Sequence, residues 1–211
     1  MRVNRQPLMG TNASESEKVL ATLACEQLRG RPGACVLIGG LGFGFTLRRV
    51  LDLVGPDATV HVVELLPEVV AWNREFLGSV NGLLLDDPRV KIFVEDVFHV
   101  LARAPVATFD AIIMDVDNGP IAMVHDGNAR LYQSQGFSAI TRTLKQDGRV
   151  TFWSASNDQA FAKRLAKAGF DVEVVRAKAH ERAKRNAHTI FVARRSHTIN
   201  QKNVTRRVHE A

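Results

Sequence analysis

Apolar residues along the chain alternate between helical spacing and short β-branched runs. Residues 14–29 place their apolar side chains on one helical face, and Ser14 with Glu17 forms a capping-box pair at the start. A strand-like run at 34–38 ends in glycines and is followed by a helical pattern over 45–54. This order predicts a lead-in helix, then a strand, a glycine turn and a second helix.

The same alternation continues to the end of the chain. Further strands are expected at 59–65, 90–95, 109–116, 150–154, 172–176 and 189–193, and further helices at 67–77, 98–101, 129–144 and 158–167, with a turn at Asp147-Gly148. Alternating strands and helices predict a doubly wound α/β fold, with a mainly parallel seven-stranded sheet and helices on both faces. The last two strands are joined by a basic loop without helical periodicity. We therefore expect a terminal antiparallel hairpin, as in class I methyltransferase-like sheets.

Length and composition indicate one globular domain. The chain has 211 residues, of which 45% are hydrophobic. We divide it into an N-terminal segment at 1–33 with the lead-in helix, a domain at 34–195 and a basic tail at 196–211. No apolar run has the roughly 18 residues of a membrane span, so a cytoplasmic protein without a membrane partner is expected. Cys25 and Cys35 lack the spacing of a zinc or disulfide site and are expected to be buried thiols.

The net charge of +6 is concentrated at one end of the chain. From Arg176 onward there are ten Lys or Arg against two Asp or Glu, whereas the preceding residues are slightly acidic. A basic end of this kind is typical of a solvated tail. Nucleic acid is therefore not the expected partner, and RNA binding by the basic region stays open as an alternative.

Glycines and acids follow the predicted strands. Gly39, Gly40, Gly42 and Gly44 form a GGLGFG turn, where missing side chains let the backbone turn tightly and approach a ligand. In an open parallel sheet, ligands bind beyond the carboxyl ends of the strands. The turn alone is compatible with a dinucleotide, a methionine-type nucleoside or close strand-to-helix packing.

Acids at the next two strand ends favour an adenosine ligand. Glu64 comes twenty positions after Gly44, where a carboxylate accepts hydrogen bonds from both ribose hydroxyls. Asp96 in VEDVF is placed to accept a hydrogen bond from the adenine amine, or to cap the helix that follows it. The adjacent Leu65 and Val97 are included in the predicted nucleoside site.

The segment MDVDNGP follows the fourth strand and faces the reactive end of such a ligand. Asp115 is the candidate catalytic group, because a carboxylate there can orient or deprotonate an amine or hydroxyl nucleophile. Asp117 and Asn118 are candidates for the substrate pocket or for an Asx-turn, and Tyr132 is a further pocket candidate. No Cys/His cluster or HExxH run is present, so no metal is expected.

These motifs resemble the spermidine synthase-like proteins, the polyamine aminopropyltransferases of the class I methyltransferase superfamily. VLIGGLGFGFTLRRVLD is similar to their VLxIGGGDGGxLREVLK segment, and DPRVKIFVEDVFHVL to their DPRVxxxxGDGxxFL. FDAIIMDVDNGP stands where the family has YDVIIxDxxDPxGP. The resemblance implies Asp115 as the catalytic acid, Glu64 and Asp96 as ribose and adenine ligands, and decarboxylated S-adenosylmethionine or S-adenosylmethionine as co-substrate.

The chain departs from the family pattern in three places, one of which is that the second acid of the family's DxxDP is displaced in the shorter DVDNGP. The family carries an N-terminal β-hairpin domain with a tyrosine-containing entry segment, where this chain has about thirty mostly helical residues, and GGGDGG becomes GGLGFG. Three functions follow as expectations: aminopropyl transfer to a small-molecule amine, methyl transfer to another acceptor, or nucleoside binding without catalysis. A homodimer through the apolar side of the lead-in helix is a further expectation.

Overall fold

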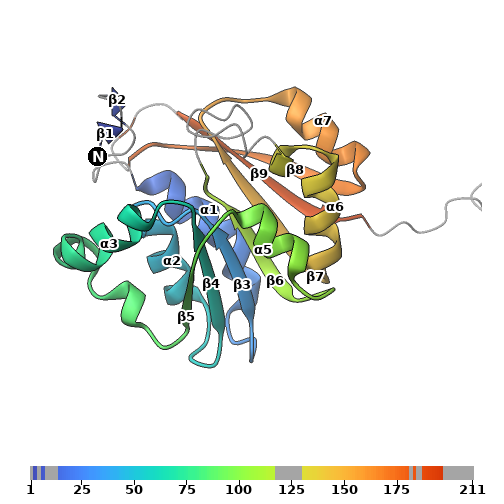
Figure 1. Cartoon of the computed structure of the whole chain (residues 1–211). Coiled ribbons are helices and arrows are strands. Elements are labelled where there is room, and N and C mark those ends of the chain that lie inside the picture. The colour runs from blue at the N-terminus through green and yellow to red at the C-terminus, as the bar shows by residue number, and fades with distance from the viewer. Residues whose placement is uncertain are drawn as a thin grey trace, which may run out of the picture.

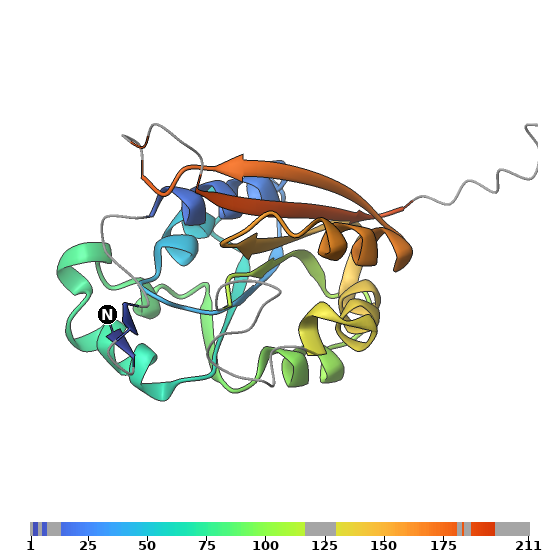
Figure 2. The ribbon, with the colours of Figure 1, turned by 90° about the horizontal axis from the view of Figure 1, so that it is seen from above.

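A central seven-stranded sheet organises the molecule in the computed structural model, which describes residues 2–3, 6–7, 14–116, 130–180, 183 and 187–196 (Figure 1). Its strands are β3 (Cys35–Gly39), β4 (Thr59–Glu64), β5 (Val90–Val94), β6 (Phe109–Met114), β7 (Leu144–Ser154), β8 (Phe170–Ala177) and β9 (His188–Arg195). Their spatial order is β5-β4-β3-β6-β7-β9-β8. Strands β3 to β7 pair in parallel, whereas β9 is antiparallel to both β7 and β8 at one edge (Figure 2). The predicted sheet and its terminal hairpin are confirmed.

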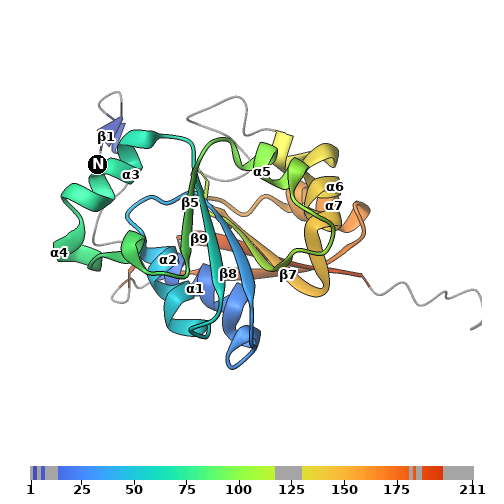
Figure 3. The same cartoon turned by 60° about the horizontal axis from the view of Figure 1, so that its bottom comes forward.

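Helices cover both faces of this sheet (Figure 3). They are α1 (Glu15–Cys25), α2 (Phe45–Leu53), α3 (Pro67–Glu75), α4 (Gly78–Asn81), α5 (Val97–Arg103), α6 (Ser134–Thr143) and α7 (Gln159–Lys167), with short 3-10 turns at Glu26–Leu28 and Leu84–Asp86. Val36 and Ile38 of β3 pack in the layer with α1 and α2, whereas Leu37 packs in the layer with α5 and α6. A parallel strand buried on both faces needs a continuous apolar run, and β3 has one. Two short strands, β1 (Arg2–Val3) and β2 (Gln6–Pro7), form a separate antiparallel pair.

Several element boundaries differ from the sequence prediction. The predicted helix at 129–144 corresponds to α6 over a shorter range, and Leu144 instead begins β7, where it pairs with Phe109. The predicted turn at Asp147-Gly148 is wrong, because both residues lie within β7 beside a register shift in its pairing with β6. Phe109 pairs with Leu144 and Ala111 with Arg149, so β7 carries three more residues than β6 across this shift, and Asp147 and Gly148 lie in that bulge.

The capping box at the start of α1 is also absent. Ser14 is the N-cap residue, but its side chain makes no capping hydrogen bond, and Glu17 accepts a hydrogen bond from Ser16 Oγ at 2.6 Å. The apolar side of α1 is buried within the chain itself, since Leu20 and Ala24 have no exposed surface. The surface suggested for a homodimer is therefore part of the core.

Candidate nucleoside site

The glycine turn joins β3 to α2 with a backbone that only glycine adopts readily. Gly40, Gly42 and Gly44 have φ angles of +91°, +52° and +82°, in the left-handed region that disfavours other residues. A Cβ atom on Gly40 would lie 2.2 Å from the backbone oxygen of Asp115. The Gly40 N–H also donates to the Val63 carbonyl at 2.8 Å. The turn is thus fixed against the ends of both neighbouring strands, β4 and β6.

Glu64 supports this turn directly. Its Oε2 accepts a hydrogen bond from the Leu41 N–H and its Oε1 accepts one from the Leu66 N–H, both at 2.9 Å. The residue is only 9% exposed, so its carboxylate is held by backbone donors on two sides. Leu65, the adjacent predicted residue, is 37% exposed beside it. The sequence predicted an acid at this strand end, but it did not predict the hydrogen bond between that acid and the turn.

Asp96 lies between β5 and α5, where it is the N-cap residue of α5. Its Oδ1 accepts a hydrogen bond from the Phe98 N–H at 2.8 Å, as an N-cap side chain does. Val97 is buried and packs under the turn, because its Cγ2 lies 3.1 Å from the position of a Cβ on Gly39. The capping alternative for Asp96 is confirmed. Its contact with adenine stays a prediction.

Asp115 lies at the end of β6, half-buried beneath the turn. Its Oδ2 accepts a hydrogen bond from Thr46 Oγ1 at 2.6 Å, and its backbone N–H donates to the Gly39 carbonyl at 2.8 Å. Burial raises the pKa of the Asp115 carboxyl to about 7, and the negative charges of Glu17 and Glu64 add to that effect, while the Thr46 bond opposes it. Burial also raises the pKa of Glu17. Asp115 therefore exchanges its proton near neutral pH.

Three residues of this site were not singled out from the sequence. Thr46 bonds Asp115, Glu17 acts on it through charge, and Asn73 Nδ2 donates to the Gly42 carbonyl at 2.8 Å. They come from α2, α1 and α3, so only packing brings them to the turn. Thr46 lies two positions after the end of GGLGFG, in the first turn of α2.

The remaining pocket candidates divide into two groups. Asp117 and Asn118 lie outside the described residues. The same holds for the residues of the predicted basic tail after Ser196. Tyr132 is 2% exposed and packs against the rings of Phe152 and Phe161, and its hydroxyl donates to the Val116 carbonyl at 3.2 Å. Tyr132 thus ties α6's leading segment to the residues that follow β6.

Within residues 14–116 and the other described segments, no group of three or more His, Cys, Asp or Glu side chains is arranged to hold a metal ion. Among the helices of the same residues, none is both long and apolar enough to cross a membrane.

Comparison with known proteins decides the family. The model of the spermine/spermidine synthase domain matches residues 17–169, more than half of the chain. The chain belongs to the spermine/spermidine synthase family. Family relatives include a polyamine aminopropyltransferase of Mycobacterium tuberculosis, 32% identical over 123 residues, which are 57% of this chain and 23% of the relative. Another, polyamine aminopropyltransferase 1 of Streptomyces coelicolor, is 36% identical over 127 residues, 59% of this chain and 23% of the relative.

The match to the relatives covers only part of their length. For the polyamine aminopropyltransferase of Pyrobaculum calidifontis, 35% identical over 117 residues, it covers 54% of this chain and 39% of the relative. The chain therefore spans well under half the length of these curated family members.

Solved structures confirm the fold of this family member. Spermidine synthase from Thermotoga maritima matches with a TM-score of 0.65 and 20% identity over 88% of this chain and 61% of that one. Human methyltransferase-like protein 13, solved in complex with SAH, also matches with a TM-score of 0.65 and 20% identity, over 86% and 81% of the two chains. The fold is methyltransferase-like.

Proposed function

We propose that the rim formed by the glycine turn, Glu64, Asp96 and Asp115 binds the adenosine part of decarboxylated S-adenosylmethionine and transfers its aminopropyl group to an amine. The observation that carries the proposal is Asp115, a half-buried carboxyl beneath the turn with its pKa raised to about 7. Membership of the spermine/spermidine synthase family and relatives named polyamine aminopropyltransferases support it.

The reaction needs little from the protein beyond position and one proton acceptor. The amine nitrogen attacks the carbon next to the sulfonium, the carbon–sulfur bond breaks, and its electron pair stays on sulfur in the leaving methylthioadenosine. The proton lost by the amine passes to the Asp115 carboxylate. A group whose pKa lies near the working pH is suited to this transfer, because its charged form is populated and still basic. Positioning supplies most of the remaining acceleration.

Glu64 is proposed to hold the ribose while it holds the turn. Each of its oxygens accepts one backbone N–H, and a carboxylate oxygen has a second lone pair for a ribose hydroxyl. Occupation of Glu64 by the ligand therefore requires no loss of its bonds to Leu41 and Leu66. Leu65, Asp96 and Val97 would line the nucleoside on either side of Glu64.

Methyl transfer from S-adenosylmethionine is the second candidate, favoured by the centre of the turn. Leu41, Gly42 and Phe43 stand where the family's GGGDGG has its acid-containing centre, and the Leu41 side chain is 3% exposed and packed in the core. The amine of the ligand's tail thus has no carboxylate partner from this part of the turn. Nucleoside binding without catalysis is the third candidate.

Calorimetry with three ligands tests the nucleoside site. We expect the wild type to bind S-adenosylmethionine, its decarboxylated form and methylthioadenosine, and Glu64→Ala to bind them about 10- to 100-fold more weakly, as loss of charge-assisted hydrogen bonds predicts. Because Glu64→Ala also removes bonds to the turn, Glu64→Gln serves as a milder variant with an intermediate loss. Glu68→Ala on the exposed side of α3 is the matched control and should bind normally.

The ligand preference separates the candidate reactions. Tighter binding of the decarboxylated ligand supports aminopropyl transfer, because the free carboxylate of S-adenosylmethionine would then lack a donor. Equal or opposite preference overturns aminopropyl transfer in favour of methyl transfer. If the wild type binds none of the three, the nucleoside site itself is refuted.

A further inference from the structure

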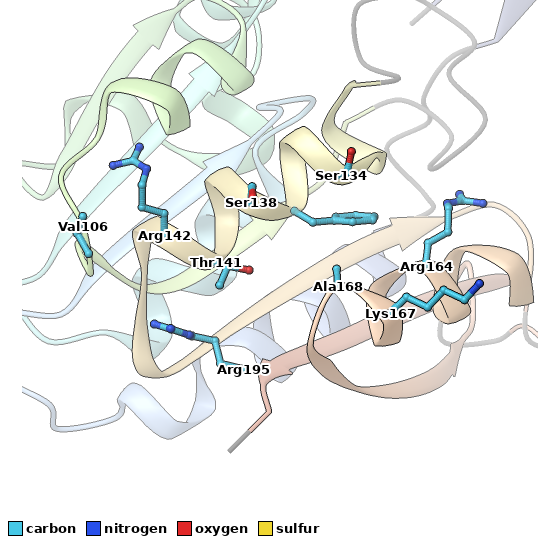
Figure 4. Close-up of a pocket in the computed structure, with 10 residues that line it drawn as sticks. Val106, Ser134, Ser138, Thr141, Arg142, Arg164, Lys167, Ala168 and Arg195 are labelled. Atoms are coloured by element: carbon cyan, nitrogen blue, oxygen red, sulfur yellow. The ribbon is translucent and has the colours of Figure 1, made fainter. Parts of the chain in front are cut away.

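A groove with a positive rim lies between α6 and α7, away from the glycine turn (Figure 4). Its volume is about 600 Å³. The walls come from α6, α7, Val106 before β6 and Arg195 at the end of β9. None of the residues assigned to the nucleoside site lines it. A ligand in this groove would therefore be separate from the proposed reaction.

Cations dominate the charged residues around the groove. Arg142, Arg164, Lys167 and Arg195 line it, and none of the other described lining residues is Asp or Glu. Two of these cations already have partners. The Arg142 guanidinium donates to the carbonyls of Leu101, Ala102 and Ala104 at the end of α5, and Arg164 lies 3.7 Å from the Asp158 carboxylate.

The other two cations are uncompensated. Within the described part of the chain, neither Lys167 nor Arg195 makes a side-chain hydrogen bond or an ion pair. Lys167 is exposed and Arg195 is half-buried. Ser138 and Thr141 add hydroxyl donors from α6 to the same groove. Unpaired cations beside hydroxyl donors, with no acid among them, are complementary to an anion rich in oxygen acceptors.

The positions of the cations suggest the shape of that anion. Figure 4 shows Arg195 and Thr141 toward one end of the groove and Arg164 and Lys167 toward the other, on different elements. The side chains do not converge on one point, as the site of a single phosphate would require. Charges spread along a groove match an acceptor with negative groups repeated along its length.

We infer that this groove binds the phosphodiester backbone of a single-stranded nucleic acid. The attraction is local rather than general, since three of the four groove cations, Arg142, Arg164 and Lys167, come from the part of the chain before Arg176, where acids slightly outnumber basic residues. Phosphate contacts of this kind carry no base specificity, so sequence-tolerant binding is expected.

Salt-dependent anisotropy of a labelled RNA on the full chain tests the inference. The probe is a fluorescein-labelled, mixed-sequence single-stranded RNA of about twenty nucleotides, enough to span one site. The variant Lys167→Ala/Arg195→Ala should bind at least about tenfold more weakly near 50 mM KCl and lower the salt slope by about 1.4 between 50 and 200 mM, since each lost phosphate contact removes about 0.7.

A second double variant provides the control. Lys163→Ala/Arg176→Ala removes the same charge from α7 and β8, at exposed residues that do not line the groove. It should retain the wild-type slope, and both double variants should keep the wild-type unfolding transition and nucleoside affinity. Equal loss in both would show a general charge effect and refute the groove.

Three other results would overturn the proposal. The first is no RNA binding by the wild type near 50 mM KCl. The second is complete loss of binding in a chain ending at Ser196, which retains the groove and would assign binding to the following residues. The third is equal competition by poly-glutamate of matched charge, which would identify an acidic protein rather than a nucleic acid as the ligand.

Discussion

Asp115 combines a cost to stability with a use in chemistry. Its carboxyl keeps a proton at pH values where an ordinary aspartate is charged, because burial disfavours the charged form and Glu17 and Glu64 add negative potential. Only the Thr46 hydroxyl bond works in the opposite direction. A proton acceptor with its pKa near 7 is thus obtained by placing the carboxyl where its ionisation destabilises the fold.

The pH dependence of folding tests this balance. The pKa of Asp115 rises from 3.8 to about 7 in the folded chain, so below about pH 4 the group costs nothing, and stability falls as pH rises from about 4 to 7. We expect Asp115→Asn, which stays neutral, to be more stable than the wild type at pH 8 by up to about 4 kcal/mol, at about 1.4 kcal/mol per unit. Its transfer activity should fall about 100-fold or more, since the proton acceptor is lost.

Urea unfolding at pH 5 and pH 8 provides the measurement. The pH dependence of Asp115→Asn should lack the Asp115 contribution and keep those of Glu17, whose pKa burial raises, and of His61 and His188, whose pKa values burial lowers and whose effect has the opposite sign. Asp52→Asn on the exposed side of α2 should follow the wild type. If Asp115→Asn also runs parallel to the wild type, Asp115 does not hold its proton in the folded chain.

For single residues, the sequence predicted which side chains lie at the strand ends better than it predicted which residues interact with them. Glu64, Asp96 and Asp115 were identified because strand ends can be read from apolar runs that stop at a polar residue. Thr46 and Glu17 were not, since their effect on Asp115 depends on how α1 and α2 pack against β6. Their spacing in the sequence contains no such information.

At the scale of elements, the glycine turn shows how one residue type is fixed by its neighbours. Gly40→Ala should cost about 2 kcal/mol or more of the free energy of unfolding beyond the left-handed strain itself, because its Cβ would overlap the Asp115 backbone at 2.2 Å. Gly169→Ala is the control, since Gly169 has the same φ of +91° and nothing within 4 Å of the added Cβ. Chemical denaturation of both variants measures the difference. Equal losses would mean that β6 moves aside without cost.

Elements with a strong periodic pattern were predicted well, and boundaries set by pairing were not. The strands β3, β4, β5 and β6 carry apolar runs that define them locally. Strand β7 begins six residues before its predicted start, because Leu144 is fully buried and pairs with Phe109 across a register shift. The Asp147-Gly148 signal marks the bulge at this register shift, whereas the strand itself begins earlier, at a pairing that the local sequence does not reveal.

At the scale of the whole molecule, Asp110 joins segments that are far apart in the chain. It is fully buried at the start of β6, where Oδ2 accepts hydrogen bonds from the Cys35 N–H at 2.8 Å and from Lys145 Nζ at 2.7 Å. Arg31 completes the cluster, with its guanidinium 3.1 Å from Oδ1. One carboxylate thus fixes the beginnings of β3, β6 and β7. These lie at the opposite end of the strands from the glycine turn.

Removing this carboxylate should therefore weaken the fold without touching the nucleoside site. We expect Asp110→Ala to lower the free energy of unfolding by about 2–4 kcal/mol, because it leaves the Cys35 N–H without its acceptor and two cations beside an uncompensated site. Arg31 and Lys145 are partly exposed, so they recover hydration and the loss stays below that of a fully buried pair.

Asp110→Asn keeps an acceptor for the Cys35 N–H and should lose less. Glu95→Ala, which breaks a surface pair with Arg103, should change little. Thermal and urea unfolding rank the three variants. Nucleoside calorimetry below the unfolding transition should give wild-type affinity for both Asp110 variants. Glu95→Ala is left out of the affinity comparison, because Glu95 adjoins Asp96. A ligand-affinity loss in Asp110→Ala equal to that of Glu64→Ala would contradict the separation of the two ends of the sheet.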